Sequence, residues 1–234
     1  HHGQIPRPTE TAQHSLMQAA QLLSARLIPL RKTDSVAAAL ELMHVQGVAE
    51  LAVVDGQQLL GYASTAALEG LSAKKSLEKA VEFPMFPVSL HIRQHLYELV
   101  PVFGNARVGV LAVCDEAGSY AGMIDLRDLN EVISKTLTYK GVGSILELHL
   151  EPRDFAPSEL MRMVEEHNAR VVGMVVNETE DGALQVSLKL NTTILRNIMA
   201  TFERHGYRVL HTYLREDQAD EDDAYRALLK FLDV

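Results

Sequence analysis

The apolar positions of this chain repeat one pattern twice. Residues 51–55 (LAVVD) and 60–64 (LGYAS) recur as residues 111–115 (LAVCD) and 121–125 (AGMID). Each copy predicts an apolar strand, an acidic turn and a second apolar strand that passes a glycine into a short helix. Since one such unit cannot bury its apolar face alone, we expect the two copies to pack as one module.

Further elements precede and join the copies. Residues 27–30 and 86–90 predict a strand ahead of each copy, and residues 35–46 and 92–103 predict the helices that follow those strands. Near-helical spacing predicts a leading helix over 14–26, and residues 74–82 indicate a charged helical connector. Two glycines within residues 138–143 mark a domain boundary, which either acts as a hinge or only turns the chain.

A different pattern follows this boundary. Residues 144–150 alternate polar with apolar, Pro157 stands near a helix start, and residues 170–177 form a β-branched run. A turn at 179–182, a strand at 184–190, a helix from Thr192 or Thr193 to His205 and a strand at 207–213 complete the order βαββαβ. This order is the ferredoxin-like split unit.

The end of the sequence is acidic and then amphipathic. Residues 216–223 (EDQADEDD) are expected to be solvated by their own repulsion. Tyr225, Leu228, Leu229 and Leu232 follow at i, i+3, i+4 and i+7, which predicts a C-terminal helix with one apolar face. That helix packs on its own subunit or on another chain.

Composition narrows the class of protein. The net charge is -9 with no basic stripe, so we expect no nucleic-acid partner. No apolar run reaches the ~20 residues of a membrane span, and no secretory signal pattern opens the chain, so we expect no membrane association. Cys114 is the only cysteine, which favours a reducing, cytoplasmic location and a buried inert thiol over a redox role. The fold class is expected to be α/β (α+β).

The repeated signature resembles the CBS domain, and two in tandem resemble a Bateman module. The resemblance covers residues 22–137, within an expected tandem region of 13–137 made of copies at 22–72 and 83–137. In many members of this family, the cleft between the copies binds adenosine-containing ligands. The resemblance therefore implies a regulatory, non-enzymatic protein.

The βαββαβ unit at 144–213 resembles an ACT-type domain, and the remainder is an acidic linker and helix at 214–234. The combination is similar to CBS-CBS-ACT proteins of the acetoin-utilisation type. In many amino-acid-binding ACT domains the first loop has an Asp and a Pro-Gly. Here residues 151–157 (EPRDFAP) include Asp154 but no glycine, which favours a dimerisation sheet over amino-acid binding.

The resemblance also implies a ligand motif, Gly-hydrophobic-x-Ser/Thr-x-x-Asp, whose hydroxyl and helix start hold phosphate while the Asp holds ribose. This chain divides the motif between its copies. The first copy has the hydroxyl but an alanine in place of the ribose carboxylate, and the second has the carboxylate but Asp125 in place of the hydroxyl. The candidate ligand-binding residues are Gly61, Ala63, Ser64, Gly122, Ile124, Asp125, Arg127 and Asp128.

Asp125 bears on the choice of ligand. It is either a helix cap alone or part of the site. A carboxylate ~4 Å from a phosphate costs about 4 kcal/mol at an effective dielectric of ~20, unless Arg127 or a metal ion intervenes. The sequence therefore favours adenosine or S-adenosylmethionine over ATP, although an adenine nucleotide remains possible. No cofactor is expected to be required.

Other chemistry is poorly supported by the sequence. His91, His95 and Glu98 either form a metal site or, as we expect, a solvated helix face. The chain has no Gly-x-Ser-x-Gly elbow, His-Glu-x-x-His motif or P-loop, so we expect no enzymatic activity. Apolar helix positions such as Leu40, Met43 and Leu99 predict a homodimer, and a regulated protein partner is possible. The competing interpretation is a ligand-free dimeric scaffold for protein interaction.

Overall fold

The computed structural model describes residues 17–84 and 87–215. The chain divides into two compact units, with the boundary between Val132 and Ile133, and each unit is described by itself. Among the described residues, no helix has the length and apolar character needed to span a membrane. The fold class is α/β, as the sequence predicts.

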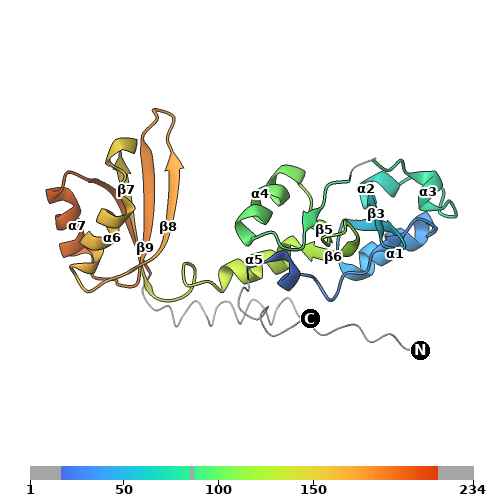
Figure 1. Ribbon diagram of the computed structural model, residues 1–234, viewed down its shortest axis with the longest axis horizontal. Coiled ribbons are helices and arrows are strands. Elements are labelled where there is room, and N and C mark those ends of the chain that lie inside the picture. The colour runs from blue at the N-terminus through green and yellow to red at the C-terminus, as the bar shows by residue number, and fades with distance from the viewer. Residues whose placement is uncertain (1–16, 85–86, 216–234) are drawn as a thin grey trace. The chain divides into compact units, whose positions relative to one another are not determined.

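The first unit holds both copies (Figure 1). Its elements are a 3-10 turn η2 (Ala19–Gln21), β1 (Leu30–Arg31), α1 (Val36–Gln46), β2 (Glu50–Asp55), β3 (Gln58–Ser64), α2 (Thr65–Leu68), α3 (Leu77–Ala80), β4 (Leu90–His91), α4 (Leu96–Ala106), β5 (Val110–Cys114), β6 (Tyr120–Asp125) and α5 (Leu126–Ser134).

The two copies have the same strand pairing. β1 pairs parallel to β2 and β2 antiparallel to β3, and in the same way β4 pairs with β5 and β5 with β6. Each sheet has three strands, and β2 packs against β5. The central strands carry LAVV and LAV runs whose side chains are almost fully buried, which is the pattern of strands covered on both faces. The expected module of two packed copies is confirmed.

Local sequence sets the helix ends. Ser35 caps α1 by accepting from the Ala38 N–H, and Gly47 ends that helix with a left-handed φ of 65°. His95 and Glu98 form a capping box at the start of α4. The predicted helix at 92–103 therefore begins later, because residues 92–94 turn to reach this cap.

The leading segment differs most from its prediction. The part of the predicted 14–26 helix that the structure describes contains only the short 3-10 turn η2. Its backbone instead bonds to the second copy: Ala19 N–H to Gln94 O at 2.9 Å and Ser24 N–H to Met123 O at 2.8 Å. These tertiary hydrogen bonds satisfy the backbone groups that a helix would have paired internally.

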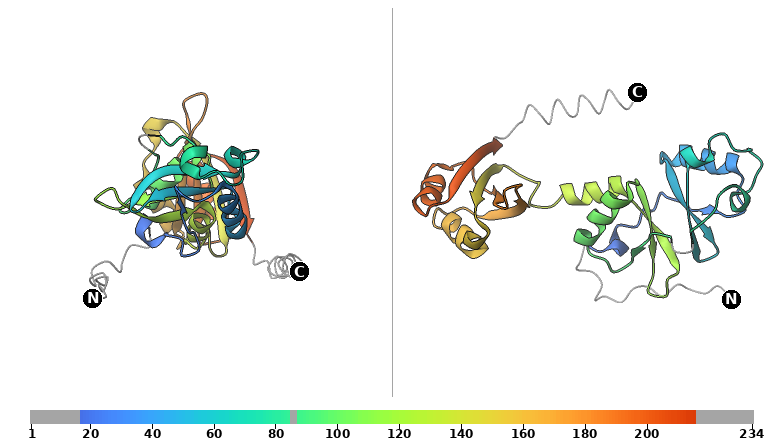
Figure 2. Two further views of the ribbon diagram at one scale, coloured as in Figure 1. Left: turned by 90° about the vertical axis from the view of Figure 1, so that its right-hand side faces the viewer. Right: turned by 90° about the horizontal axis from the view of Figure 1, so that it is seen from above.

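The second unit is a four-stranded antiparallel sheet with the order β10-β7-β9-β8. Its elements are β7 (Gly143–Leu150), a 3-10 turn η3 (Pro152–Asp154), α6 (Pro157–Glu165), β8 (Val171–Glu178), β9 (Leu184–Leu190), α7 (Arg196–Arg204) and β10 (Arg208–Arg215). The order βαββαβ is confirmed. Both helices cover the same face of the sheet, and the other face has no helix of the described residues on it (Figures 1 and 2).

Of the two glycines in the predicted hinge, one belongs to a β-strand. Gly143 is the first residue of β7 and pairs with Arg215. A Cβ at this position would lie 2.1 Å from the Leu190 carbonyl oxygen, so the glycine permits a close approach of two strands. Gly141, with a φ of 84°, turns the chain in open space.

Candidate functional site

Each copy has a junction at which a strand passes into a helix: β3 into α2 in the first copy and β6 into α5 in the second. Each junction is covered by residues from the start of the other copy. Leu23, at the start of the first copy, lies over Gly122 in the second, where a Cβ on the glycine would be 3.1 Å from Leu23 Cδ2. Phe83 and Pro84, at the start of the second copy, lie over Gly61 in the first, with corresponding distances of 3.0 and 3.2 Å. Residues from both copies therefore build each of the two junctions.

At the second junction, the Asp125 carboxylate is almost buried, with 3% of its side chain exposed. Its Oδ1 accepts from the Arg127 backbone N–H at 2.8 Å, so Asp125 caps the first turn of α5. Its Oδ2 accepts from Arg127 Nη2 at 2.7 Å and from Arg26 Nη2 at 2.5 Å. The capping role is therefore observed, together with an ion pair to Arg127, which the sequence named as a possible partner, and one to Arg26, which it did not indicate.

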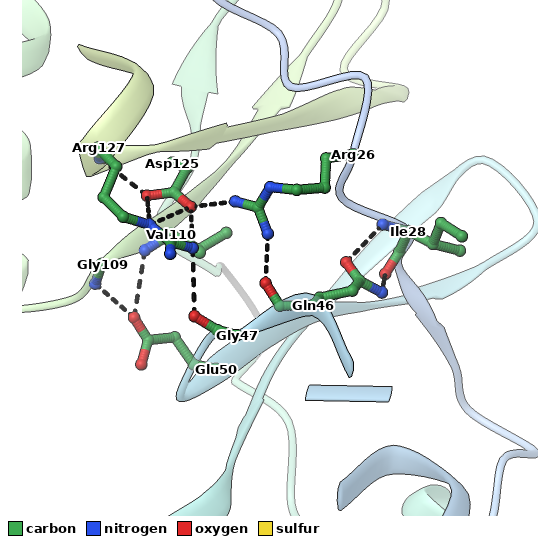
Figure 3. A network of polar contacts seen from close by, with 9 residues as sticks. All are labelled: Arg26, Ile28, Gln46, Gly47, Glu50, Gly109, Val110, Asp125 and Arg127. Carbon is green, nitrogen blue, oxygen red and sulfur yellow. Dashed lines mark hydrogen bonds and ion pairs between the residues drawn. The ribbon is translucent and has the colours of Figure 1, made fainter. Parts of the chain in front are cut away.

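The same two arginines reach the first copy at the end of α1 (Figure 3). Arg127 Nη2 donates to the Gly47 carbonyl at 3.1 Å, and Arg26 Nη1 donates to the Gln46 carbonyl. Carbonyls at a helix C-terminus carry partial negative charge and lack helical partners. The arginines thus connect the negative end of α1, through Asp125, to the positive start of α5.

This pairing keeps Asp125 ionised. Burial raises the pKa of its carboxyl, but the hydrogen bonds and charge of Arg127, with the hydrogen bond from Arg26, outweigh burial and hold the pKa below its usual value of 3.8. In return, Asp125 raises the pKa of Arg127. The negative charge of Asp125 is therefore compensated. The sequence predicted that Asp125 would repel a phosphate unless Arg127 or a metal ion intervened, and in the structure Arg127 does so, together with Arg26.

Two further side chains support the contact between the copies beside Asp125, one across the copies and one within the first copy. Glu50, at the start of β2, accepts through Oε1 from the Val110 N–H at 3.1 Å and from the Gly109 N–H (Figure 3). The Gln46 side chain pairs with both backbone groups of Ile28, at 2.9 and 3.3 Å, and so holds the segment that carries Arg26. Buried polar groups linked in this way give a defined relative position of the copies.

The first junction has neutral groups at the corresponding positions. Ser64 Oγ accepts from the Ala67 N–H at 3.2 Å and caps α2. Tyr62 spans the copies, donating to the Val88 carbonyl at 2.7 Å and accepting from the Ala112 N–H at 2.9 Å. Burial raises the pKa of Tyr62 to about 12, so it remains a hydrogen-bond donor at neutral pH.

The structure brings together only part of the predicted site. Asp125 and Arg127 meet directly, and Asp128 is close enough for its charge to raise the Arg127 pKa further. Ile124 and Ala63 are buried core residues, so only their backbone groups are candidates for ligand contact. Gly61, Ser64 and Ala63 form the first junction, separate from the Asp125 network.

Sequence reasoning missed Arg26, Leu23 and Glu50. Arg26 and Leu23 were assigned to the predicted leading helix, and nothing local shows that their segment crosses to the other copy. Glu50 stands at a strand start, where a solvated carboxylate is the ordinary expectation. The only available signal was the repeat itself, which predicts that the two copies pack as one module.

The weaker candidates have structural roles. Among residues 17–84 and 87–215, no group of three or more His, Cys, Asp or Glu side chains is placed to hold a metal ion. His95 and Glu98 instead cap α4, and His91 Nδ1 accepts from the Arg93 N–H at 3.2 Å. Cys114 is a free thiol of intermediate exposure at the end of β5, rather than fully buried.

The first loop of the second unit borders a polar cavity of about 590 Å³. Pro152–Asp154 form the turn η3, and His149, His205 and Arg208 also line the cavity. Asp154 faces Arg153 at 3.8 Å, and the Tyr207 hydroxyl donates to the Asp154 carbonyl at 3.4 Å. Asp154 thus lies beside a polar cavity.

Similar folds occur among solved structures of CBS-domain proteins. One is a CBS domain pair/ACT domain protein from Thermotoga maritima, with 20% identity, a TM-score of 0.47, and coverage of 52% of this chain and 99% of that chain. Another is the CBS domains of a transcriptional regulator from Streptococcus pneumoniae, with 16% identity, a TM-score of 0.45, and coverage of 50% and 99%. A third is CBSX2 in complex with AMP, with 18% identity, a TM-score of 0.44, and coverage of 50% and 96%. No family model and no curated protein matches the sequence.

Proposed function

We propose that this chain is a regulatory, non-enzymatic protein whose tandem CBS-like unit senses an adenosyl-type small molecule. The ligand binds at the second junction only, one per chain. Leu23 supplies an apolar wall for the base, Asp128 accepts from the ribose hydroxyls, and the start of α5 faces the remainder of the ligand. Ligand binding is read out through the relative position of the two copies, because Arg26 and Arg127 contact both.

The proposal rests on a difference between the two carboxylates at this junction: one has partners within the protein and the other does not. Asp125 is fully engaged by two arginines, whereas Asp128 has no hydrogen-bond or ion-pair partner among the described residues. Asp128 is also half-buried. A carboxylate left unpaired in such a position favours a ligand that donates to it, and a vicinal diol offers two donors in a suitable geometry.

Calorimetric titration of the chain with adenosine, AMP, ATP, NADH and S-adenosylmethionine tests this proposal. We expect saturable binding of at least one of them, weakened about 10- to 150-fold by Asp128→Ala, which corresponds to the loss of hydrogen bonds to a charged acceptor. Asn130→Ala, an exposed position on the same helix, is the control and should leave affinity unchanged. Equal affinities in the two variants would contradict the role of Asp128.

A dimeric scaffold without ligand is the second candidate, and one observation favours it. Leu23 at one junction, and Phe83 with Pro84 at the other, already lie against the glycines where a ligand's backbone contacts are expected. In this alternative, both junctions serve only to join the copies. Absence of binding to every compound in the titration, with the protein folded, would support the scaffold.

We further propose a homodimer through helices of the first unit. Tyr97 and Val100 on α4 are 82% and 45% exposed, and Val45 on α1 is 70% exposed. Exposed apolar side chains on two helices are suited to a second layer of protein. Light scattering at micromolar concentration should give twice the chain mass, and Tyr97→Glu should reduce it to the monomer value. A monomeric mass for the unaltered chain would contradict this proposal.

A further inference from the structure

The uncovered face of the sheet in the second unit contains an apolar depression of about 250 Å³. The sheet forms its floor and residues 138–139 form a wall. The wall is held in place, because Thr138 Oγ1 donates to the Val172 carbonyl at 3.1 Å and a Cβ on Gly173 would lie 2.4 Å from Thr138 Cγ2. The lining residues are Thr138, Tyr139, Ile145, Gly173, Val175, Ser187, Lys189, Tyr213 and Leu214.

Large apolar side chains around this depression are open to solvent. Tyr139, Val175, Tyr213 and Leu214 are 56%, 49%, 52% and 56% exposed. They are contiguous through the depression that they line, unlike single exposed residues, which occur on any protein surface. Lys189 is the one charged residue in the lining, and no carboxylate among the described residues is within ion-pair distance of it.

We propose that the C-terminal segment of this chain, residues 224–234, docks in this depression of its own subunit. Its apolar positions Tyr225, Leu228, Leu229 and Leu232 have the spacing of one helix face. β10 ends at Arg215, immediately after Tyr213 and Leu214 of the lining, so the segment follows from the border of the depression. The segment therefore follows the lining residues closely in the chain, and both the segment and the depression present apolar side chains.

The connecting residues 216–223 have sufficient length and suitable charge. Eight residues reach up to about 26 Å, and a sheet of four strands is about 15 Å across. The connection thus allows the segment to turn back over the face beside β10. In the docked arrangement, Glu216, Asp217 and residues 220–223 would bring negative charge near Lys189, which has no ion-pair partner among the described residues.

Fluorescence provides a direct test, because the chain has no tryptophan. The substitution Tyr213→Trp places a single indole in the lining. In the full chain we expect emission shifted to the blue and weak quenching by acrylamide. Adding Leu228→Glu and Leu232→Glu should shift the emission to the red and increase quenching. Adding Ala227→Glu, on the opposite helix face with one new charge, is the control and should change neither.

Three outcomes would overturn the proposal. The first is equal quenching with and without the two leucine substitutions. The second is an equal effect of Ala227→Glu. The third is protection that disappears on dilution from high to low micromolar concentration, which would identify a second copy as the occupant. Val175→Trp, at another lining position, repeats the test if Tyr213→Trp does not fold.

Discussion

The two strand-to-helix junctions of the first unit have the same backbone design but different chemistry. Both have a glycine with a φ of 155° and a capping side chain at the helix start. In both, side chains from the start of the other copy lie over the glycine and form its cover. At the first junction the cap is Ser64 and the cover is Phe83 with Pro84. At the second the cap is Asp125, which pairs with Arg26, and the cover over Gly122 is Leu23.

This difference shows that one repeated backbone framework joins the two copies through two kinds of contact. The first junction is joined to the other copy by the neutral hydroxyl of Tyr62, whereas the second is joined by a buried carboxylate and two arginines. Only the second retains a carboxylate, Asp128, one helical turn beyond the cap. The single site per chain that we propose rests on this asymmetry, and the substitutions below test it by treating the junctions in pairs.

The largest effect on stability is expected at the two caps. Asp125→Ala removes a cap and the shared partner of Arg26 and Arg127, which should lower the free energy of unfolding by about 2–3 kcal/mol. Ser64→Ala removes only a cap and should cost about 1 kcal/mol. Urea denaturation of both variants measures the difference. Equal losses would mean that the arginine pairs contribute nothing beyond capping.

The next largest loss of stability is expected from substitutions of the two glycines that lie under the covering side chains. Gly61→Ala and Gly122→Ala both add a Cβ in a backbone conformation that favours glycine, at a cost of about 1–2 kcal/mol each. Gly61→Ala should cost more, because its neighbours are an aromatic ring and a proline, whereas Leu23 can change rotamer. Thermal unfolding of the two variants ranks them, and a larger loss at Gly122 would show that Leu23 is the more rigid cover.

Tyr62→Phe tests the neutral connection at the first junction. The substitution leaves the Ala112 N–H without its acceptor and should cost about 1–2 kcal/mol. Met123→Leu, at the equivalent buried position of the second copy, alters packing with no hydrogen bond lost and is expected to cost less. If Met123→Leu is the more destabilising of the two, the hydroxyl does not join the copies.

The smallest effect is a dependence of stability on pH at the second junction. The pKa of Asp125 is lower in the folded chain than its usual 3.8, so the unfolded chain takes up the proton first as pH falls. The stability from Asp125 is therefore full above its usual pKa and is lost as pH falls through the lower folded value. Urea denaturation between about pH 6 and about pH 3 should show a weaker decline for Asp125→Asn than for Ser64→Ala. Identical declines would place the pH dependence elsewhere.

The architecture was predictable because its signals are local. Repeated strand patterns and the alternation of polar and apolar positions at residues 144–150 each specify structure within a few residues. The same holds for Pro157 at the first turn of α6. These signals gave the two copies and the βαββαβ order, with errors mainly at element ends, where caps such as His95 decide the boundary.

The site was less predictable because its contacts are distant in sequence. Asp125 was identified from its motif position, but Arg26 lies 99 residues away and meets it only after the leading segment crosses to the second copy. Periodicity favoured a helix for that segment, and tertiary backbone hydrogen bonds to Ile92, Gln94 and Met123 replaced it. The charge state of the junction could therefore not be inferred before the fold was known.

The stoichiometry of ligand binding tests the central claim most directly. Calorimetric titration with the best ligand of the adenosyl series should give one molecule per chain, with binding weakened by Asp128→Ala and retained in Ser64→Ala. Two molecules per chain, or equal weakening by both substitutions, would contradict a site confined to the second junction.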